Sequence, residues 1–179
     1  MNLTLIRHTA VDVPKGVCYG QTDVPLAPTF EAEARQVRDL IDGSEFDMVF
    51  TSPLSRCVRL ASACGYPDAR RDARLMEMDF GEWEMKRWDE ITDPRLQEWY
   101  DDYFNVTATG GESFVSQGRR VASFIASLRE SGYRRVAIFT HGGTIIQFLL
   151  NLGLITPETT FDHQPPYGGI VEVSLSQSQ

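Results

Sequence analysis

Three apolar runs of this sequence are followed at once by residues that could bind and attack an anion. They are NLTLI (2–6) followed by Arg7 and His8, FDMVF (46–50) followed by TSPLSR with Arg56 at its end, and VAIFT (136–140) followed by His141 and Gly142. A guanidinium group matches the geometry of a phosphate group and stays charged at neutral pH, whereas an unprotonated imidazole is a nucleophile at that pH. Together these side chains could hold a phosphate group and attack its phosphorus atom.

The elements that would bring these residues together alternate between strand and helix. Strands are expected at 2–6, 46–50, 136–140 and 169–175, and helices at 30–41, at Pro53 onward with Thr51 or Ser52 as the cap, at 113–130 and from 142 onward. This alternation predicts an α/β fold, a three-layer sandwich with a mainly parallel central sheet flanked by helices. Because ligands bind beyond the carboxyl ends of parallel strands, both histidines and both arginines would meet at one edge of the sheet.

The length of 179 residues predicts a single domain, residues 1–179. Its middle, residues 77–112, is expected to form an irregular and partly helical insertion over the site. The segment carries many acids, several turn signals and all three tryptophans, Trp83, Trp88 and Trp99. These tryptophans could stack on a nucleoside base or simply belong to the core. At its end, Glu112 and Ser113 could touch the site or cap the helix that follows.

Composition and charge argue against several classes of protein. The formal net charge of −8 argues against a nucleic-acid partner, because a phosphate backbone requires a basic surface. Neither a membrane-spanning run nor a signal peptide is recognised, so no membrane partner is expected. Cys18, Cys57 and Cys64 lack the spacing of a disulfide framework or a zinc site, and Cys57 and Cys64 suit the buried face of a helix. These features predict a cytoplasmic protein.

Each of the three strand-end segments, taken alone, is explained more simply by structure than by chemistry. An Arg–His pair can cap a strand at the surface, Arg56 can be exposed, and the glycines after His141 can allow helix–sheet packing. Their joint occurrence at three strand ends in one chain reverses that preference. No metal and no other cofactor is expected, because the positive groups suffice for a phosphate and the histidines lack an HxH or HxxxH spacing.

Together the motifs resemble the histidine phosphatase superfamily, which has the phosphoglycerate mutase-like fold. The resemblance is carried, in order, by LIRH (5–8), TSPLSR (51–56), EMDFGEWE (77–84), GGES (110–113) and THGGTI (140–145). It implies that His8 is the nucleophile of a phosphohistidine mechanism and that Glu77, four residues before the glycine of its motif, is the general acid and base. Arg7, Arg56, His141 and the backbone N–H of Gly142 would bind the phosphate group, with His141 also catalytic.

Within the superfamily, YGQTDVPL (19–26) and the short length look most like α-ribazole-5′-phosphate phosphatases of cobalamin nucleotide-loop assembly. This resemblance implies a small-molecule phosphomonoester as substrate, either α-ribazole 5′-phosphate or adenosylcobalamin 5′-phosphate. Tyr19, Gln21 and Thr22 could line the substrate mouth or form an ordered turn. The sequence departs from the superfamily at Thr9 and Ala10, where RHG followed by an acid is usual.

Other functions remain open beside this one. A phosphatase of broad specificity fits the same motifs, as does a phosphoglycerate mutase-type phosphotransferase. The insertion that mutases carry before the second half of the chain is missing, which counts against a mutase. A non-catalytic module that binds phosphorylated ligands would be expected to have lost His8 or Glu77, and both are present. The sequence leaves a homodimer open.

Overall fold

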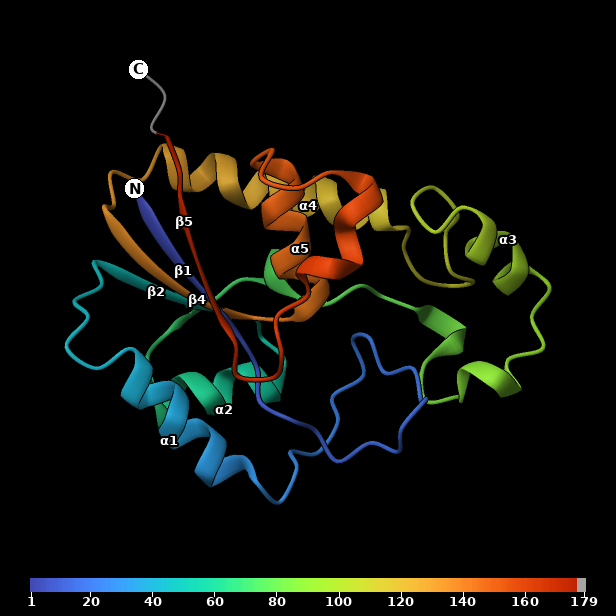
Figure 1. Cartoon of the computed structure of the whole chain (residues 1–179), viewed down its shortest axis with the longest axis horizontal. Coiled ribbons are helices and arrows are strands. Elements are labelled where there is room, and N and C mark those ends of the chain that lie inside the picture. Colours follow the sequence, from blue (N-terminus) through green and yellow to red (C-terminus); the bar gives the residue numbers. More distant parts are fainter. Residues whose placement is uncertain (177–179) are drawn as a thin grey trace.

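The structure is a computed structural model and describes residues 1–176. Strands and helices alternate along the chain, as expected (Figure 1). The strands are β1 (Asn2–Arg7), β2 (Met48–Thr51), β3 (Arg70–Arg71), β4 (Arg135–Thr140) and β5 (Ile170–Ser174). The α-helices are α1 (Phe30–Leu40), α2 (Ser55–Ala63), α3 (Arg95–Asp101), α4 (Phe114–Arg129) and α5 (Gly142–Asn151). Short 3₁₀ helices are η1 (Ala73–Leu75), η2 (Gly81–Trp83), η3 (Trp88–Glu90) and η4 (Pro157–His163).

The sheet has the strand order β3-β2-β4-β1-β5. Strands β1 to β4 are parallel to their neighbours, and β5 pairs antiparallel to β1 at the edge. The last residues of the central strands are in register, with Arg7 opposite Thr140 and Thr51 opposite Phe139. The residues that follow these three strands therefore emerge side by side, which confirms the predicted α/β fold with a mainly parallel sheet.

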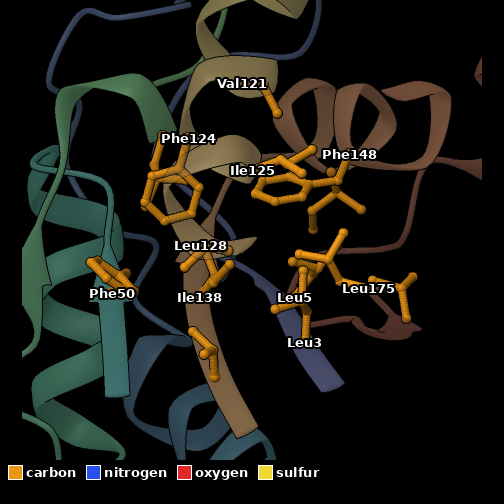
Figure 2. Close-up of a cluster of buried hydrophobic side chains, with 14 of the residues drawn as sticks. Leu3, Leu5, Phe50, Val121, Phe124, Ile125, Leu128, Ile138, Phe148 and Leu175 are labelled. Carbon is orange, nitrogen blue, oxygen red and sulfur yellow. The ribbon is translucent and has the colours of Figure 1, made fainter. Parts of the chain in front are cut away.

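Alternating residues of the strands form two hydrophobic layers, one on each face of the sheet. Leu3, Leu5 and Ile138 lie in the layer covered by α4 and α5, where Phe124 and Phe148 pack on them (Figure 2). Ile6, Ala137 and Phe139 point to the opposite face, which α1 and α2 cover. The period of two along β1 and β4 thus builds the three-layer sandwich seen edge-on in Figure 1.

Two local features differ from the expectations. Strand β3 consists of two exposed arginines, so it has no apolar run by which sequence could reveal it. Helix α2 begins at Ser55 with Leu54 as the N-cap residue, and neither Thr51 nor Ser52 caps it as expected. The carboxylate of Asp23 accepts hydrogen bonds from the backbone N–H and the hydroxyl of Ser55 instead. This contact joins segments 32 residues apart, which explains why a local capping rule missed it.

Residues 77–112 contain η2, η3 and α3 and extend beyond the carboxyl ends of the central strands (Figure 1). Their side chains form a separate apolar cluster around Trp83, Leu96 and Ala108. Part of the segment therefore packs on itself, and Met78 and Phe80 pack against Phe114 of α4 and Ile146 of α5. The segment is positioned to form one side of anything bound at the strand ends. Among residues 1–176, none of the helices combines the length and apolar character of a membrane span.

Candidate active site

His8 follows β1 directly and is almost completely buried, with 2% of its surface exposed. Its Nδ1 lies 2.8 Å from the carbonyl oxygen of Thr9, which can only accept a hydrogen bond, so Nδ1 carries the proton. Burial and the Arg56 guanidinium lower the pKa of the His8 imidazole from 6.5 to about 3. The ring is therefore neutral at physiological pH, and its Nε2 has a free lone pair.

His141 follows β4 and packs edge-on against His8, with their ring centroids 5.2 Å apart. Its Nε2 lies 2.8 Å from the hydroxyl oxygen of Ser52, the residue that follows β2. Burial and Arg56 lower the pKa of His141 well below its usual value, so this ring is neutral as well. The three central strands thus contribute His8, Ser52 and His141 to one buried group.

Arg7 and Arg56 lie near both histidines and are oriented by backbone carbonyl groups. Arg56 is fully buried and donates to the carbonyl oxygens of Gly20 and Thr22 at 2.6 and 3.1 Å. Arg7 donates to the carbonyl oxygen of Pro165 at 2.6 Å. Within residues 1–176, neither guanidinium forms a salt bridge with a carboxylate. Their positive charge is thus left for an anion.

Buried polar atoms without a partner are concentrated at this site. In the described part of the chain, five buried side-chain nitrogen or oxygen atoms have no hydrogen-bond partner. They are Arg7 Nε, Thr9 Oγ1, Arg56 Nε, Gln117 Oε1 and Trp99 Nε1. Buried polar groups are normally paired, because an unpaired one costs about 1–3 kcal/mol. The site therefore carries unmet hydrogen-bonding capacity, a common property of binding sites.

Glu77 lies beside the start of α5, where Gly143 makes room for it. One carboxylate oxygen of Glu77 accepts the backbone N–H of Gly143 at 3.1 Å, and the other accepts Gln117 Nε2, also at 3.1 Å. A Cβ atom at position 143 would collide with the Glu77 carboxylate, and one at 142 would collide with the side chain of Gln164. The second glycine of HGG thus permits the approach of Glu77, and the first permits the approach of Gln164.

The backbone of Glu77 is fixed by two side chains that lie outside the cavity. Its carbonyl oxygen accepts hydrogen bonds from Arg120 at 2.8 Å and from Gln21 at 2.9 Å. Arg120 also forms a salt bridge of 2.6 Å with Glu112. The sequence left open whether Glu112 and Ser113 touch the site or cap the next helix. Ser113 forms the N-cap and capping box of α4. Glu112 holds Arg120, and Arg120 in turn holds the backbone of Glu77.

A cavity of about 230 Å³ opens at this point, and we call it the site cavity. Arg7, Glu77 and Gly143 line it, and Tyr19 is among its other lining residues. Gln21 and Thr22, proposed as lining residues from sequence, are absent from the lining; their backbone N–H groups bind the Glu84 carboxylate, which gives them the role of an ordered turn. A larger hollow of about 510 Å³ lies beside Asn2 and Ser174, at the opposite end of the sheet.

Tyr167 covers the buried histidines and was missed in the sequence. Its ring lies 4.1 Å from the Arg7 guanidinium carbon and 5.5 Å from the His8 ring, and its hydroxyl bonds to that of Tyr19 at 2.8 Å. The pairing joins residues 148 positions apart, and no local motif marks Tyr167. The tyrosine pair therefore lies beside His8 and Arg7, and Tyr19 also lines the site cavity.

The cysteines and acids near the site form no recognisable metal centre. Cys57 and Cys64 are buried core residues, as predicted, and Cys18 is buried too. Among residues 1–176, no three or more histidine, cysteine, aspartate or glutamate side chains gather in an arrangement that could hold a metal ion.

The neutral state of His8 makes the stability of the fold depend on pH. Between pH 6.5 and about 3 the unfolded chain protonates His8 and the folded chain does not, so stability falls as the pH falls through this range. Replacing His8 by asparagine removes this dependence. From about pH 7 to about pH 4.5, the wild type should lose roughly 2–3 kcal/mol more unfolding free energy than His8→Asn. Urea denaturation at both pH values measures it, and equal losses would show that His8 is not held neutral.

Comparison with known proteins assigns the chain to a family. The profile described as "Histidine phosphatase superfamily (branch 1)" matches residues 3–179, and the chain therefore belongs to that superfamily. The resemblance seen in the sequence motifs is thus confirmed over almost the whole chain. The superfamily includes phosphatases and mutases, so the coarse activity is phosphoryl-group chemistry.

Individual relatives refine this assignment. An adenosylcobalamin/alpha-ribazole phosphatase of Escherichia coli (strain K12) is 29% identical over 161 residues, covering 85% of this chain and 79% of that protein. The crystal structure of the alpha-ribazole phosphatase from Shigella flexneri has a TM-score of 0.90 and 27% identity, covering 99% of this chain and 92% of that one. A phosphoglycerate mutase structure from Thermus thermophilus has a TM-score of 0.77 and 31% identity, covering 97% and 92%. The fold is therefore phosphoglycerate mutase-like.

Proposed function

We propose that this protein is a metal-independent phosphomonoesterase that works through a phosphohistidine intermediate at His8 and acts on α-ribazole 5′-phosphate. The observation that carries the proposal is the state of His8. It is neutral, its Nδ1–H is anchored on the Thr9 carbonyl oxygen, and two nearby guanidinium groups, Arg7 and Arg56, help to lower its pKa and form no salt bridge within residues 1–176. A nucleophile with a free lone pair next to phosphate-binding cations is what phosphoryl transfer requires.

In the first step, His8 Nε2 forms a bond to phosphorus while the bond from phosphorus to the alcohol oxygen breaks. Arg7, Arg56, His141 and the backbone N–H of Gly142 bind the three remaining oxygens, and these groups are in place before the reaction begins. Gly142 opens α5, where the helix dipole also favours an anion. Glu77 in its protonated form gives its proton to the leaving alkoxide, and the alcohol departs.

In the second step, water replaces the alcohol. Glu77, now a carboxylate, takes a proton from the water as its oxygen attacks phosphorus and the bond to His8 Nε2 breaks. Inorganic phosphate and neutral His8 result, and Glu77 is again protonated. The hydrogen bonds from Gly143 and Gln117 hold the carboxylate in one orientation for both steps.

The charge of the site cavity supports a nucleoside-like alcohol over a sugar acid. Among the described residues that line it, Arg7 and Glu77 are the only charged ones. Arg7 is needed for the phosphate group, so the carboxylate of a phosphoglycerate would find no second cation and would face Glu77. The cavity, of about 230 Å³, is too small to enclose a corrinoid ring, so the corrinoid of adenosylcobalamin 5′-phosphate would remain outside it, whereas α-ribazole 5′-phosphate carries no such group.

A panel of phosphomonoesters assayed by phosphate release tests this proposal. We expect kcat/KM for α-ribazole 5′-phosphate to exceed that for 3-phosphoglycerate and phosphoserine by at least about 100-fold, since an unpaired charge in the cavity is costly. Mutase activity on 3-phosphoglycerate should be absent. Equal or better turnover of either acid would contradict the assigned substrate.

The same assay with excess EDTA tests whether a metal takes part. Two arginines and neutral N–H donors can balance a phosphate dianion, so activity should survive exhaustive chelation. Loss of turnover with EDTA, restored by Mg²⁺ or Zn²⁺, would overturn the metal-independent mechanism.

A further inference from the structure

One side of the site cavity is built almost entirely from aromatic rings, and we call this side the aromatic wall. Its members are Phe80, Trp88, Trp99, Tyr103, Phe114 and Phe161. Trp88 and Trp99 stack on one another with their centroids 5.6 Å apart and their planes 16° apart. Trp83, in contrast, is fully buried in the adjacent core and does not reach the cavity.

The rings of the aromatic wall are joined to one another by a chain of ring contacts. Phe80 contacts both tryptophans, Trp99 contacts Tyr103, and Tyr103 contacts Phe161 at 5.0 Å. Met78, the neighbour of Glu77, also lines the cavity. The wall therefore begins next to the proposed general acid, on the side where the alcohol of a bound phosphomonoester would lie.

Phe161, at the outer end of the wall, is unusually exposed for its type, with 62% of its surface accessible. Its one ring contact within the described chain is with Tyr103. An apolar ring left exposed at the mouth of a cavity gains free energy when a ligand covers it. Within residues 1–176, no charged side chain other than Arg7 and Glu77 lines the cavity, so the ligand group that covers the wall is uncharged.

We propose that the aromatic wall binds a planar, uncharged aromatic group carried by the alcohol of the substrate, and that Phe161 determines specificity for it. The inference rests on the proposed function, because it places the base of α-ribazole 5′-phosphate against the wall while the phosphate group reaches His8. Rings stack on rings without regard to hydrogen-bond pattern, so the wall selects an aromatic group as a class.

Two esters with the same leaving oxygen separate this effect from phosphate binding. α-Ribazole 5′-phosphate carries the aromatic base, and ribose 5-phosphate lacks it. In Phe161→Ala the ratio of kcat/KM for the first ester to that for the second should fall about 5- to 100-fold, mainly through KM. Phe161→Tyr should restore the ratio, and Phe161→Leu, which is apolar but not aromatic, should not. Rescue by leucine would overturn an aromatic role.

Tyr100 provides the matched control. Its ring is 52% exposed and contacts Trp99, but it does not line the cavity, so Tyr100→Ala should leave the ratio unchanged. An equal fall in Tyr100→Ala and Phe161→Ala, or no fall in either, would overturn the proposal.

Binding without turnover separates the inference from the proposed function. Free α-ribazole should quench the tryptophan fluorescence of the wild type saturably. Phe161→Ala should raise the Kd for α-ribazole by the same factor by which it lowers the ratio of the two kcat/KM values. If the wild type bound α-ribazole but hydrolysed neither ester, the proposed phosphatase activity would be wrong. The proposed role of the aromatic wall in binding would then remain. If the wild type hydrolysed both esters equally and α-ribazole did not bind, the proposed role of the aromatic wall would be wrong. The proposed phosphatase activity would then remain.

Discussion

Replacing His8 by alanine should lower kcat by at least about 10⁴-fold on every phosphomonoester, because the variant has no group that can form the covalent intermediate. His141, the nearest imidazole, has its Nε2 against the Ser52 hydroxyl and cannot take the place of His8. Steady-state phosphate release measures the loss. Circular dichroism and thermal melting check that the variant is folded.

His163 provides the control for this variant. It is exposed at the end of η4 and does not line the site cavity, so His163→Ala should retain close to full activity. Activity of more than a few per cent in His8→Ala would mean that the attacking group is elsewhere, most simply a water molecule.

The second large effect is expected at Glu77, and it depends on the leaving group. Glu77→Gln keeps the shape of the side chain and an oxygen that can accept the Gly143 N–H, but it cannot supply a proton. For an alkyl ester such as α-ribazole 5′-phosphate, kcat should fall by about 10² to 10⁴-fold. For p-nitrophenyl phosphate, whose phenolate leaves without a proton, the fall should be much smaller.

Glu82→Gln is the matched control, since Glu82 belongs to the same motif but does not line the site cavity. It should leave both esters unaffected. Equal losses on both esters in Glu77→Gln would indicate that Glu77 binds phosphate or maintains the loop. A large loss in Glu82→Gln that is confined to the alkyl ester would mean that Glu82, and not Glu77, is the general acid.

The residues at the ends of the central strands could be predicted to lie together, because a parallel sheet fixes where its strand ends lie. Three apolar runs of the same direction bring their carboxyl ends to one edge, so His8, Arg56 and His141 could be placed together without knowing any contact. The departure from the superfamily at Thr9 is also explained at this level. His8 uses the backbone carbonyl of Thr9, and the Thr9 backbone has no positive φ, so a side chain is tolerated there.

The outer part of the site depends on contacts between distant segments, which leave no local pattern. Tyr167 meets Tyr19 across 148 positions. Glu77 is held by Gln117, which is 40 residues away and reads in sequence as one more polar residue of a helix. The tryptophans show the same limit, because the spacing of Trp83, Trp88 and Trp99 does not reveal which of them is core. Only the packing of residues 77–112 separates Trp83 from the two that line the cavity.

The central claim is that His8 becomes phosphorylated during turnover, and trapping the intermediate tests it most directly. Wild-type protein mixed with a ³²P-labelled phosphomonoester and quenched in alkali within the first turnover should carry label that is stable to base and lost in acid. Mass spectrometry of the alkaline digest should place the phosphoryl group on the peptide that contains His8, and His8→Ala should carry none. Label on another residue, or no label while phosphate is released at the normal rate, would contradict the account.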